Sequence, residues 1–385
     1  MAWTSRVPAS DSPAVAAALL RAIRHLPTRS PRWHAACPPV HPPNNLLLRK
    51  GHVMPESMCL VSVVIPVFNS APTLARAAAS ALCQTVAPLE LLIVDDGSRD
   101  SSAAEAHRIA ASDNRVRVIA LPENRGKPFA MNLAIAEARG TWIAVLDADD
   151  CYADSRLATL IAAGEQNAAD LVADNQYFHD PGAGQTIRTA FSPTVVDRIL
   201  TRHDFIAGSD ALADFNFGML KPVIRADFIR RTGLLYREAA RLSENFLYLV
   251  EFFAAGGRAF LVARPLYYWT QAFGSVSRRW TETGAGPWRY DFQAARAPHR
   301  EVRESLRELG DADLIALLDR RDRALRKLHL LREISRLRDT NRGLAALALA
   351  IACHPSLWPL VLRRALHAMS PPRTNSRIGV DSTVT

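Results

Sequence analysis

Long apolar runs are missing from this chain of 385 residues. A membrane-spanning helix needs about 18 consecutive apolar residues. The longest candidate, Leu344 to Cys353, ends at His354-Pro355. Cysteine is scarce as well: the five residues are scattered, with neither a C-x-x-C motif nor paired spacing. This pattern favours neither a zinc knuckle nor a disulfide framework, so we expect a folded protein in a reducing cytoplasm.

Glycine-rich phosphate-binding motifs are also absent. No G-x-G-x-x-G follows the first apolar run, and Gly126-Lys127 lacks the upstream glycine and the following Ser or Thr of G-x-x-x-x-G-K-[ST]. The segment 68–72 likewise lacks the glycine-rich, basic loop expected of a nucleotidyltransferase. These absences count against dehydrogenases, P-loop enzymes and nucleotidyltransferases.

Charge is distributed unevenly along the chain, whose net charge is +9. Residues 1–53 hold seven Lys and Arg against one acid, and residues 296–385 hold seventeen against ten. The centre, 54–295, therefore has a net charge of −4. An acidic centre argues against nucleic acid as a partner. The basic ends either contact an anionic surface, such as a membrane leaflet, or are simply solvated.

Apolar runs alternate with helical segments between Val61 and Leu146. The runs 61–67, 89–94, 115–121 and 141–146 are typical of buried strands, and the segments between them are typical of helices. This alternation predicts an α/β fold with a mixed, mostly parallel sheet and helices on both faces. Ligands bind beyond the carboxyl ends of the strands in such sheets, and polar residues directly follow three of these runs.

Two acidic clusters follow buried strands in this region. Asp147 and Asp149, with one residue between them, would repel each other, and a divalent cation shared with substrate phosphates would relieve the repulsion. Alternatively, these acids cap a helix expected to begin near Ser155. At the second cluster, Asp95 and Asp96, a carboxylate either accepts a hydrogen bond from a nucleotide base or ribose, or belongs to a solvated turn.

Four motifs in this order resemble the family-two glycosyltransferases of the GT-A fold: IPVFN at 65–69, VDDGSRDSS at 94–102, NRGKPFAMN at 124–132 and LDADD at 146–150. Within that family the chain is most similar to bacterial exopolysaccharide enzymes of the succinoglycan class. The resemblance covers roughly Leu60 to Ser277. It implies an inverting, metal-dependent hexosyltransferase that moves a sugar from a nucleotide-diphosphate sugar to a glycan or lipid-linked acceptor.

The same resemblance implies roles for individual residues. It assigns eight of them to the nucleotide-sugar donor: Pro66, Phe68, Asn69, Asp95, Asp96, Arg125, Lys127 and Asn132. Asp147 and Asp149, a D-x-D motif, would hold Mg²⁺ or Mn²⁺ at the donor diphosphate. Ordinary surface charge explains Arg125 and Lys127 equally well.

The acceptor half departs from the family's pattern. The family's general base is an Asp, usually following a Glu near the start of a later helix, where it deprotonates the acceptor hydroxyl. Here the matching pair is Glu244-Asn245, and an amide cannot accept a proton at neutral pH. Either Glu244 is the base, which we favour, or the alignment slips by one residue, or catalysis is weakened or absent. In the last case the chain is a non-catalytic nucleotide- or carbohydrate-binding relative.

The flanking segments suggest a domain organisation. Residues 1–57 are expected to be a disordered extension or the result of a start codon assigned too far upstream. The transferase domain would span 58–290, with a donor half at 60–175 and an acceptor half at 176–290. A helical region at 291–370 and a disordered tail at 371–385 would follow. The basic stretch 344–366 predicts peripheral contact with the inner face of the cell membrane, although a packed helical pair explains it as well.

Overall fold

The computed structural model describes residues 59–180, 184–211, 213, 215–240, 243–270 and 296–338. The expected N-terminal extension, the stretch 344–366 and the tail lie outside these residues. Of the helices in the described part of the chain, none combines the length and apolar composition needed to cross a membrane.

The described residues form ten strands and nine α-helices, with one short 3-10 helix, η1 (Phe217–Met219). The strands are β1 (Val61–Val67), β2 (Leu89–Asp95), β3 (Val116–Ala120), β4 (Trp142–Val145), β5 (Cys151–Tyr152), β6 (Leu171–Asp180), β7 (Gln185–Thr189), β8 (Arg198–Leu200), β9 (Val223–Arg225) and β10 (Ala259–Thr270). The helices are α2 (Ala71–Leu82), α3 (Ser102–Ser112), α4 (Lys127–Glu137), α5 (Arg156–Gln166), α6 (Arg202–Ala207), α7 (Ala226–Thr232), α8 (Glu244–Ala254), α9 (Arg296–Glu308) and α10 (Ala312–Arg338).

All the described strands belong to one mixed sheet. Its order is β3-β2-β1-β4-β9-β6-β10-β5, with β7 beside β6 and β8 beside β10. Strands β1 to β4 pair in parallel, as do β6 and β10, whereas β9 runs antiparallel to both of its neighbours. The predicted α/β fold with a mixed, mostly parallel sheet is therefore confirmed.

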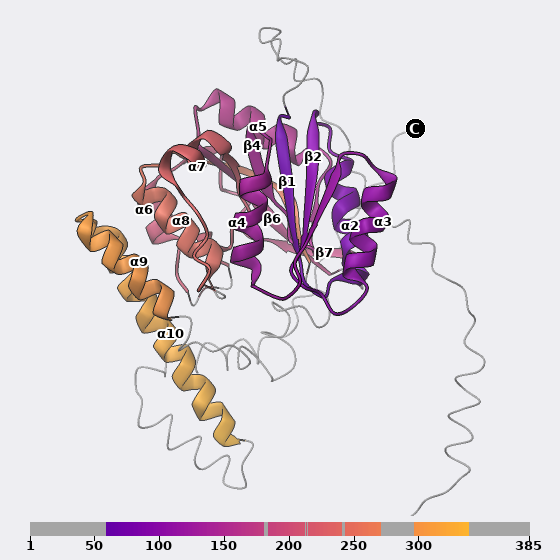
Figure 1. Cartoon of the computed structure of the whole chain (residues 1–385). Coiled ribbons are helices and arrows are strands. Elements are labelled where there is room, and N and C mark those ends of the chain that lie inside the picture. The colour runs from indigo at the N-terminus through magenta and orange to yellow at the C-terminus, as the bar shows by residue number, and fades with distance from the viewer. Residues whose placement is uncertain are drawn as a thin grey trace, which may run out of the picture. The chain divides into compact units, whose positions relative to one another are not determined.

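Hydrophobic side chains cover both faces of the parallel strands. On one face Val64 and Leu92 pack with Met131 of α4, and on the other Val63 and Leu91 belong to a cluster with α2 and α3. Figure 1 shows α4 on one side of β1 and β2, and α2 and α3 on the other. Burial on both faces explains why these strands read as continuous apolar runs instead of alternating ones.

The register of the parallel strands brings their carboxyl ends to one edge of the sheet. Val67 at the end of β1 pairs with Asp95 at the end of β2, and β4 ends beside them. The turn after β2 requires a glycine, because Gly97 has φ +65° and a Cβ there would lie 2.4 Å from the carbonyl carbon of Glu123. The loops after β1, β2 and β4 thus meet at this edge.

The C-terminal extension is helical over the described residues and joins the main core. Val302 of α9 and Leu317 of α10 belong to the same hydrophobic cluster as Phe246 of α8. Arg321 of α10 donates to Ser243 Oγ (3.1 Å) and lies over the Phe246 ring, 3.8 Å from its centroid. These contacts fix the beginning of α8, which carries the Glu244-Asn245 pair.

Candidate active site

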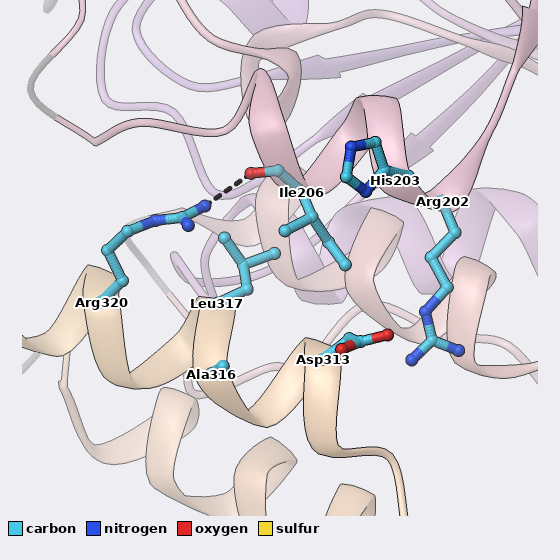
Figure 2. Close-up of a pocket in the computed structure, with 7 residues that line it drawn as sticks. All are labelled: Arg202, His203, Ile206, Asp313, Ala316, Leu317 and Arg320. Atoms are coloured by element: carbon cyan, nitrogen blue, oxygen red, sulfur yellow. Dashed lines mark hydrogen bonds between the residues drawn. The ribbon is translucent and has the colours of Figure 1, made fainter.

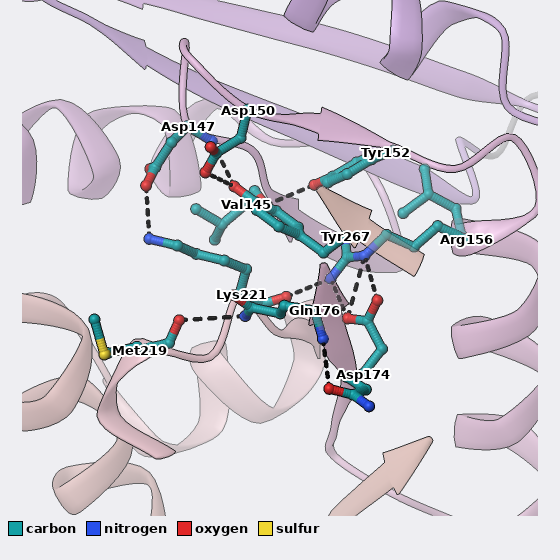
Figure 3. Close-up of polar contacts among 12 residues, drawn as sticks. Val145, Asp147, Asp150, Tyr152, Arg156, Asp174, Gln176, Met219, Lys221 and Tyr267 are labelled. Carbon is teal, nitrogen blue, oxygen red and sulfur yellow. Dashed lines mark hydrogen bonds and ion pairs between the residues drawn. The ribbon is translucent and has the colours of Figure 1, made fainter. Parts of the chain in front are cut away.

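Asp147, directly beyond β4, is held by two lysines from different parts of the chain. Its Oδ1 accepts a hydrogen bond from Lys127 Nζ (2.7 Å), and its Oδ2 accepts one from Lys221 Nζ (2.6 Å). Lys127 begins α4, and Lys221 lies between η1 and β9. Figure 3 shows the Lys221 ammonium directed at the Asp147 carboxylate. We call these three residues the lysine clamp.

Electrostatics keep two members of the lysine clamp ionised. Burial alone would raise the pKa of Asp147, but Lys127 and Lys221 outweigh it and hold that pKa well below its usual value. Burial alone would lower the pKa of Lys127, but the carboxylates of Asp147 and Glu244 raise it above its usual value. Asp147 is therefore a carboxylate, and Lys127 an ammonium, at neutral pH.

The next two acids of the motif have different surroundings. Asp150 is fully buried and accepts hydrogen bonds from Tyr267 Oη (2.6 Å) and the Thr270 backbone N–H (2.7 Å). The Asp149 carboxylate forms no ion pair with any of the described residues. Burial, and then the nearby Asp147 charge, raise the pKa of Asp149. None of these acids caps α5, whose N-cap is Ser155, so the capping alternative is wrong.

These residues fit a divalent cation. Asp149 offers a carboxylate that forms no ion pair with a described residue, and each Asp147 oxygen has a second lone pair beyond the one that faces a lysine. Within the described residues, no group of three or more His, Cys, Asp or Glu side chains could hold a metal ion. A cation at Asp147 and Asp149 would therefore complete its shell with water and ligand phosphates, as Mg²⁺ prefers.

Asp95 and Asp96 are adjacent but differ in their hydrogen bonding. Asp96 accepts from the backbone N–H groups of Arg125 (2.7 Å) and Gly126 (2.8 Å) and from Asn124 Nδ2 (2.8 Å). It thereby fixes the loop that leads into Lys127, and its burial rules out a solvated turn. Asp95 is also buried, yet its Oδ1 has no hydrogen-bond partner among the described residues. A buried acceptor without a donor is costly, so Asp95 is suited to a ligand N–H or O–H.

The other residues assigned to the donor divide into two groups. Pro66 lies near the end of β1, and Phe68 and Asn69 follow that strand, at the same edge as Asp95; Phe68 is 44% exposed. The Asn132 side chain, in contrast, forms two hydrogen bonds of 2.8 Å with the backbone of Tyr236: Nδ2 donates to the carbonyl oxygen and Oδ1 accepts from the N–H. These bonds connect α4 to the segment before α8. Asn132 as a donor contact stays a prediction.

Arg125 lies in the loop that Asp96 holds. Its guanidinium lies over the Phe129 ring, 3.7 Å from the centroid, and 3.8 Å from Glu238 Oε2. The side chain is about half exposed. Arg125 is therefore beside Lys127 in the chain but outside the lysine clamp.

Helix α8 brings Glu244 to the lysine clamp. Glu244 Oε1 lies 3.3 Å from Lys127 Nζ, so one ammonium contacts both Asp147 and Glu244. Asn245 is the next residue of the same helix and is buried. Ser243, immediately before the helix, has φ +65°, a strained conformation for a residue with a Cβ, and Arg321 binds its hydroxyl.

Sequence reasoning missed Lys221. One signal was available: the chain has only four lysines among its 47 basic residues, and Lys127 and Lys221 are the two that lie in its acidic centre. A lone lysine before Pro222, however, gives no indication of a partner 74 residues away. The Arg156–Asp174 pair, fully buried at 2.7 Å, was missed for the same reason.

A pocket in the structure lies away from the predicted site, between α6 and α10. Figure 2 shows its lining residues, Arg202, His203, Ile206, Asp313, Ala316, Leu317 and Arg320. Two of its cations are engaged within the protein: Arg320 donates to the Ile206 carbonyl, and Arg202 pairs with Asp311. None of the predicted site residues lines this pocket, which we interpret as the junction between the C-terminal helices and α6.

Comparison with known proteins gives matches over the same region. Residues 62–223 match the family model described as Glycosyl transferase family 2. The succinoglycan biosynthesis protein ExoO of Rhizobium meliloti (strain 1021) is 36% identical over 221 residues, which are 57% of this chain and 62% of that protein. ExoU of the same strain is 36% identical over 204 residues, 51% of this chain and 58% of that protein. The chain thus spans about three-fifths of the length of these relatives.

Solved structures show a related fold. The S. aureus TarS fragment 1–349, solved with UDP-GlcNAc, superposes with a TM-score of 0.54 and 16% sequence identity, over 68% of this chain and 72% of that chain. At this identity the likeness concerns the fold alone.

Proposed function

We propose that this chain, whose residues 62–223 match the model of glycosyl transferase family 2, transfers a sugar from a nucleotide-diphosphate sugar to a glycan or lipid-linked acceptor in exopolysaccharide biosynthesis. One observation carries the proposal. Glu244, from the acceptor half, and Asp147, from the donor half, contact the same Lys127 ammonium at 3.3 Å and 2.7 Å. A carboxylate that can take a proton thus lies close to Asp147, one of the two carboxylates that would hold a metal ion for the donor diphosphate.

Donor binding would use the edge formed by β1, β2 and β4. Asp95 Oδ1 would accept a hydrogen bond from the base or ribose, and the exposed Phe68 ring would line the nucleotide pocket. When bound at Asp147 and Asp149, Mg²⁺ or Mn²⁺ would supply positive charge to the diphosphate. The UDP-GlcNAc complex of TarS, a protein of related fold, is consistent with a nucleotide-sugar donor.

The transfer would be a single in-line displacement. The acceptor hydroxyl oxygen forms a bond to the anomeric carbon while the bond from that carbon to the diphosphate oxygen breaks. The nucleoside diphosphate leaves with the electron pair, and the hydroxyl proton passes to the Glu244 carboxylate. Attack from the face opposite the leaving group inverts the anomeric carbon. Lys127 lies between Glu244 and Asp147 and would keep the base close to the reacting centre.

Asn245 favours a second candidate function. If Glu244 does not accept the proton, the chain binds the nucleotide sugar without transferring it. A buried amide directly after Glu244, where the family has its acid, is the observation behind this alternative.

A donor screen separates the two functions. UDP-, GDP-, dTDP- and ADP-sugars are tested by thermal shift with Mn²⁺ and with EDTA, and nucleotide release is then measured with a glycan acceptor. We expect one donor to raise the melting temperature further with Mn²⁺ and to be consumed. Binding without consumption would favour the non-catalytic function, and an unshifted melting temperature with every donor would contradict both.

A variant pair tests the metal site in the same assay. Asp149→Asn should lose the Mn²⁺-dependent part of the shift in melting temperature. Of the two proposed metal ligands, Asp149 is the one that forms no ion pair with a described lysine, so its negative charge would be matched mainly by the metal ion. Asp154→Asn, at an exposed position a few residues on, is the matched control and should keep it. Donor binding that ignored Mn²⁺ in the unaltered protein would remove the role given to Asp147 and Asp149.

A further inference from the structure

We propose that Lys221 contacts the donor diphosphate directly and is a second phosphate-binding cation beside Lys127. This inference rests on the proposed function. It assigns to Lys221 a role that neither the sequence motifs nor the family resemblance indicated. The alternative is that Lys221 only holds the Asp147 carboxylate in place.

The first argument concerns unused hydrogen-bond donors. An ammonium group has three N–H donors, and in the described part of the chain Lys221 Nζ makes a single hydrogen bond, to Asp147 Oδ2 at 2.6 Å. The residue is only 8% exposed, so water reaches its other donors poorly. Lys127, in comparison, already divides its ammonium between Asp147 and Glu244. Lys221 therefore has the larger capacity for a further acceptor.

The second argument concerns how the Lys221 backbone is anchored. Its carbonyl oxygen accepts a hydrogen bond from Arg156 Nη2 at 2.5 Å, and Arg156 is itself paired with Asp174 at 2.7 Å. The side chains of both Arg156 and Asp174 are fully buried. Figure 3 shows the Lys221 side chain extending from this anchored backbone toward Asp147. A fixed main chain with a flexible four-carbon stem lets the ammonium change partner without moving the fold.

The third argument concerns charge. A diphosphate brought to Asp147 and Asp149 meets two carboxylates and is repelled unless cations lie between them. Lys221 is already in contact with one of those carboxylates. From this position its ammonium can keep one N–H on Asp147 and offer the others to phosphate oxygens. Hydrogen bonds between two charged groups are the strong ones, so the contact should be visible in the affinity for diphosphate.

The test compares two pairs of full-length proteins in EDTA, so that no metal contributes. Unaltered protein is compared with Lys221→Met, and Asp147→Asn is compared with Asp147→Asn/Lys221→Met. In the second pair the side chain at position 147 is an uncharged amide, so Lys221 has no Asp147 carboxylate to position. The double variant removes the carboxylate and the Lys221 ammonium together, so neither is left buried without the other. The ligand is whichever of UDP, GDP, CDP, ADP and dTDP binds the unaltered protein most tightly, together with its nucleoside.

If Lys221 contacts phosphate, removing it weakens nucleoside diphosphate binding about tenfold or more in both pairs, since a hydrogen bond to a charged group is lost. Nucleoside binding should not change, which also reports that the base site is folded. Lys327→Met, a change on α10 far along the chain, should alter neither affinity. If the double variant binds the diphosphate as tightly as Asp147→Asn, Lys221 only positions Asp147 and the inference is wrong, while the proposed function stands. If the unaltered protein binds none of the five diphosphates in EDTA, the inference is wrong; if it binds none with Mn²⁺ either, the proposed function fails as well.

Discussion

Glu244 Oε1 lies 3.3 Å from Lys127 Nζ, although one residue begins α8 and the other begins α4. The same ammonium binds Asp147 Oδ1 at 2.7 Å. The beginnings of two helices and the turn after β4 therefore meet at one cation. This arrangement supports Glu244 over Asn245 as the proton acceptor, because Glu244 is a carboxylate that reaches the donor edge.

Glu244→Gln should reduce sugar transfer by about 100-fold or more, the usual range for loss of a general base. Donor binding should remain close to that of the unaltered protein, because the amide keeps the shape of the side chain. Initial rates of nucleoside diphosphate release, with and without acceptor, provide the measurement. Glu301→Gln, at an exposed position of α9, is the control and should be fully active.

A double variant then decides between the two neighbouring positions. If Glu244→Gln/Asn245→Asp recovers most of the transfer rate, the base belongs at 245 and our assignment is wrong. We expect no recovery, because Asn245 is buried in the first turn of α8 whereas Glu244 contacts Lys127.

Asp95→Asn should weaken binding of the nucleoside and of the nucleoside diphosphate by a similar factor, about tenfold. The physical reason is that Asp95 Oδ1 is a buried acceptor with no hydrogen-bond partner within the described part of the chain, and an amide N–H₂ in its place would face the ligand donor. Calorimetry with both ligands gives the ratio. A loss confined to the diphosphate would place Asp95 near the phosphates and contradict a base or ribose contact.

Much of the parallel half of the fold could be predicted from the sequence because its strands are buried on both faces. The predicted strand 61–67 coincides with β1. The strands predicted at 89–94, 115–121 and 141–146 differ from β2, β3 and β4 by one residue at one or both ends. Beyond residue 150, pairing is non-local and mixed: β9 lies between β4 and β6, and β10 is irregular between Val262 and Tyr267. No local periodicity encodes such pairing.

The site was predictable where function follows from position on a strand. Asp95 is the last residue of β2, Asp147 and Asp149 follow β4, and parallel strands end at a common edge. A motif does not show which of two adjacent acids forms hydrogen bonds within the protein. The hydrogen bonds that Asp96 accepts from the backbone of residues 125 and 126 were therefore not predicted. Asp96 as a donor contact stays a prediction. Lys221 was missed because its role depends on tertiary packing.

Acidification should selectively weaken the beginning of α6. Thr201 and Asp204 form a capping box there, in which Thr201 Oγ1 accepts from the Asp204 backbone N–H and Asp204 Oδ2 accepts from the Thr201 backbone N–H. Burial alone would raise the pKa of Asp204, but hydrogen bonds from Thr201 and the charge of Arg198 lower it below 3.8. The unfolded state therefore binds the proton more readily than the folded state does.

It follows that ionised Asp204 makes its full contribution to the free energy of unfolding above the pKa that it has in the unfolded state. That contribution is lost as pH falls through the lower pKa that Asp204 has in the folded state. At neutral pH, Asp204→Asn should cost about 1 kcal/mol of unfolding free energy, as for other helix caps. The difference between the two proteins should shrink toward pH 3. Urea unfolding at several pH values measures it, with Asp154→Asn as the exposed control; a difference that grew on acidification would have the wrong sign.

Arg156→Met should destabilise the protein by about 3–5 kcal/mol, the usual cost of leaving one member of a buried ion pair without its partner. The Asp174 carboxylate would remain fully buried without the 2.7 Å contact from the guanidinium, and the Lys221 carbonyl would lose its donor. Arg156→Met/Asp174→Leu removes both charges and should recover a large part of that loss, because two apolar side chains leave no buried charge unpaired. Urea unfolding of the three proteins measures this recovery. Equal stabilities of the single and double variants would contradict it. The double variant should also bind nucleoside diphosphate more weakly than the unaltered protein, since the backbone that presents Lys221 is no longer anchored.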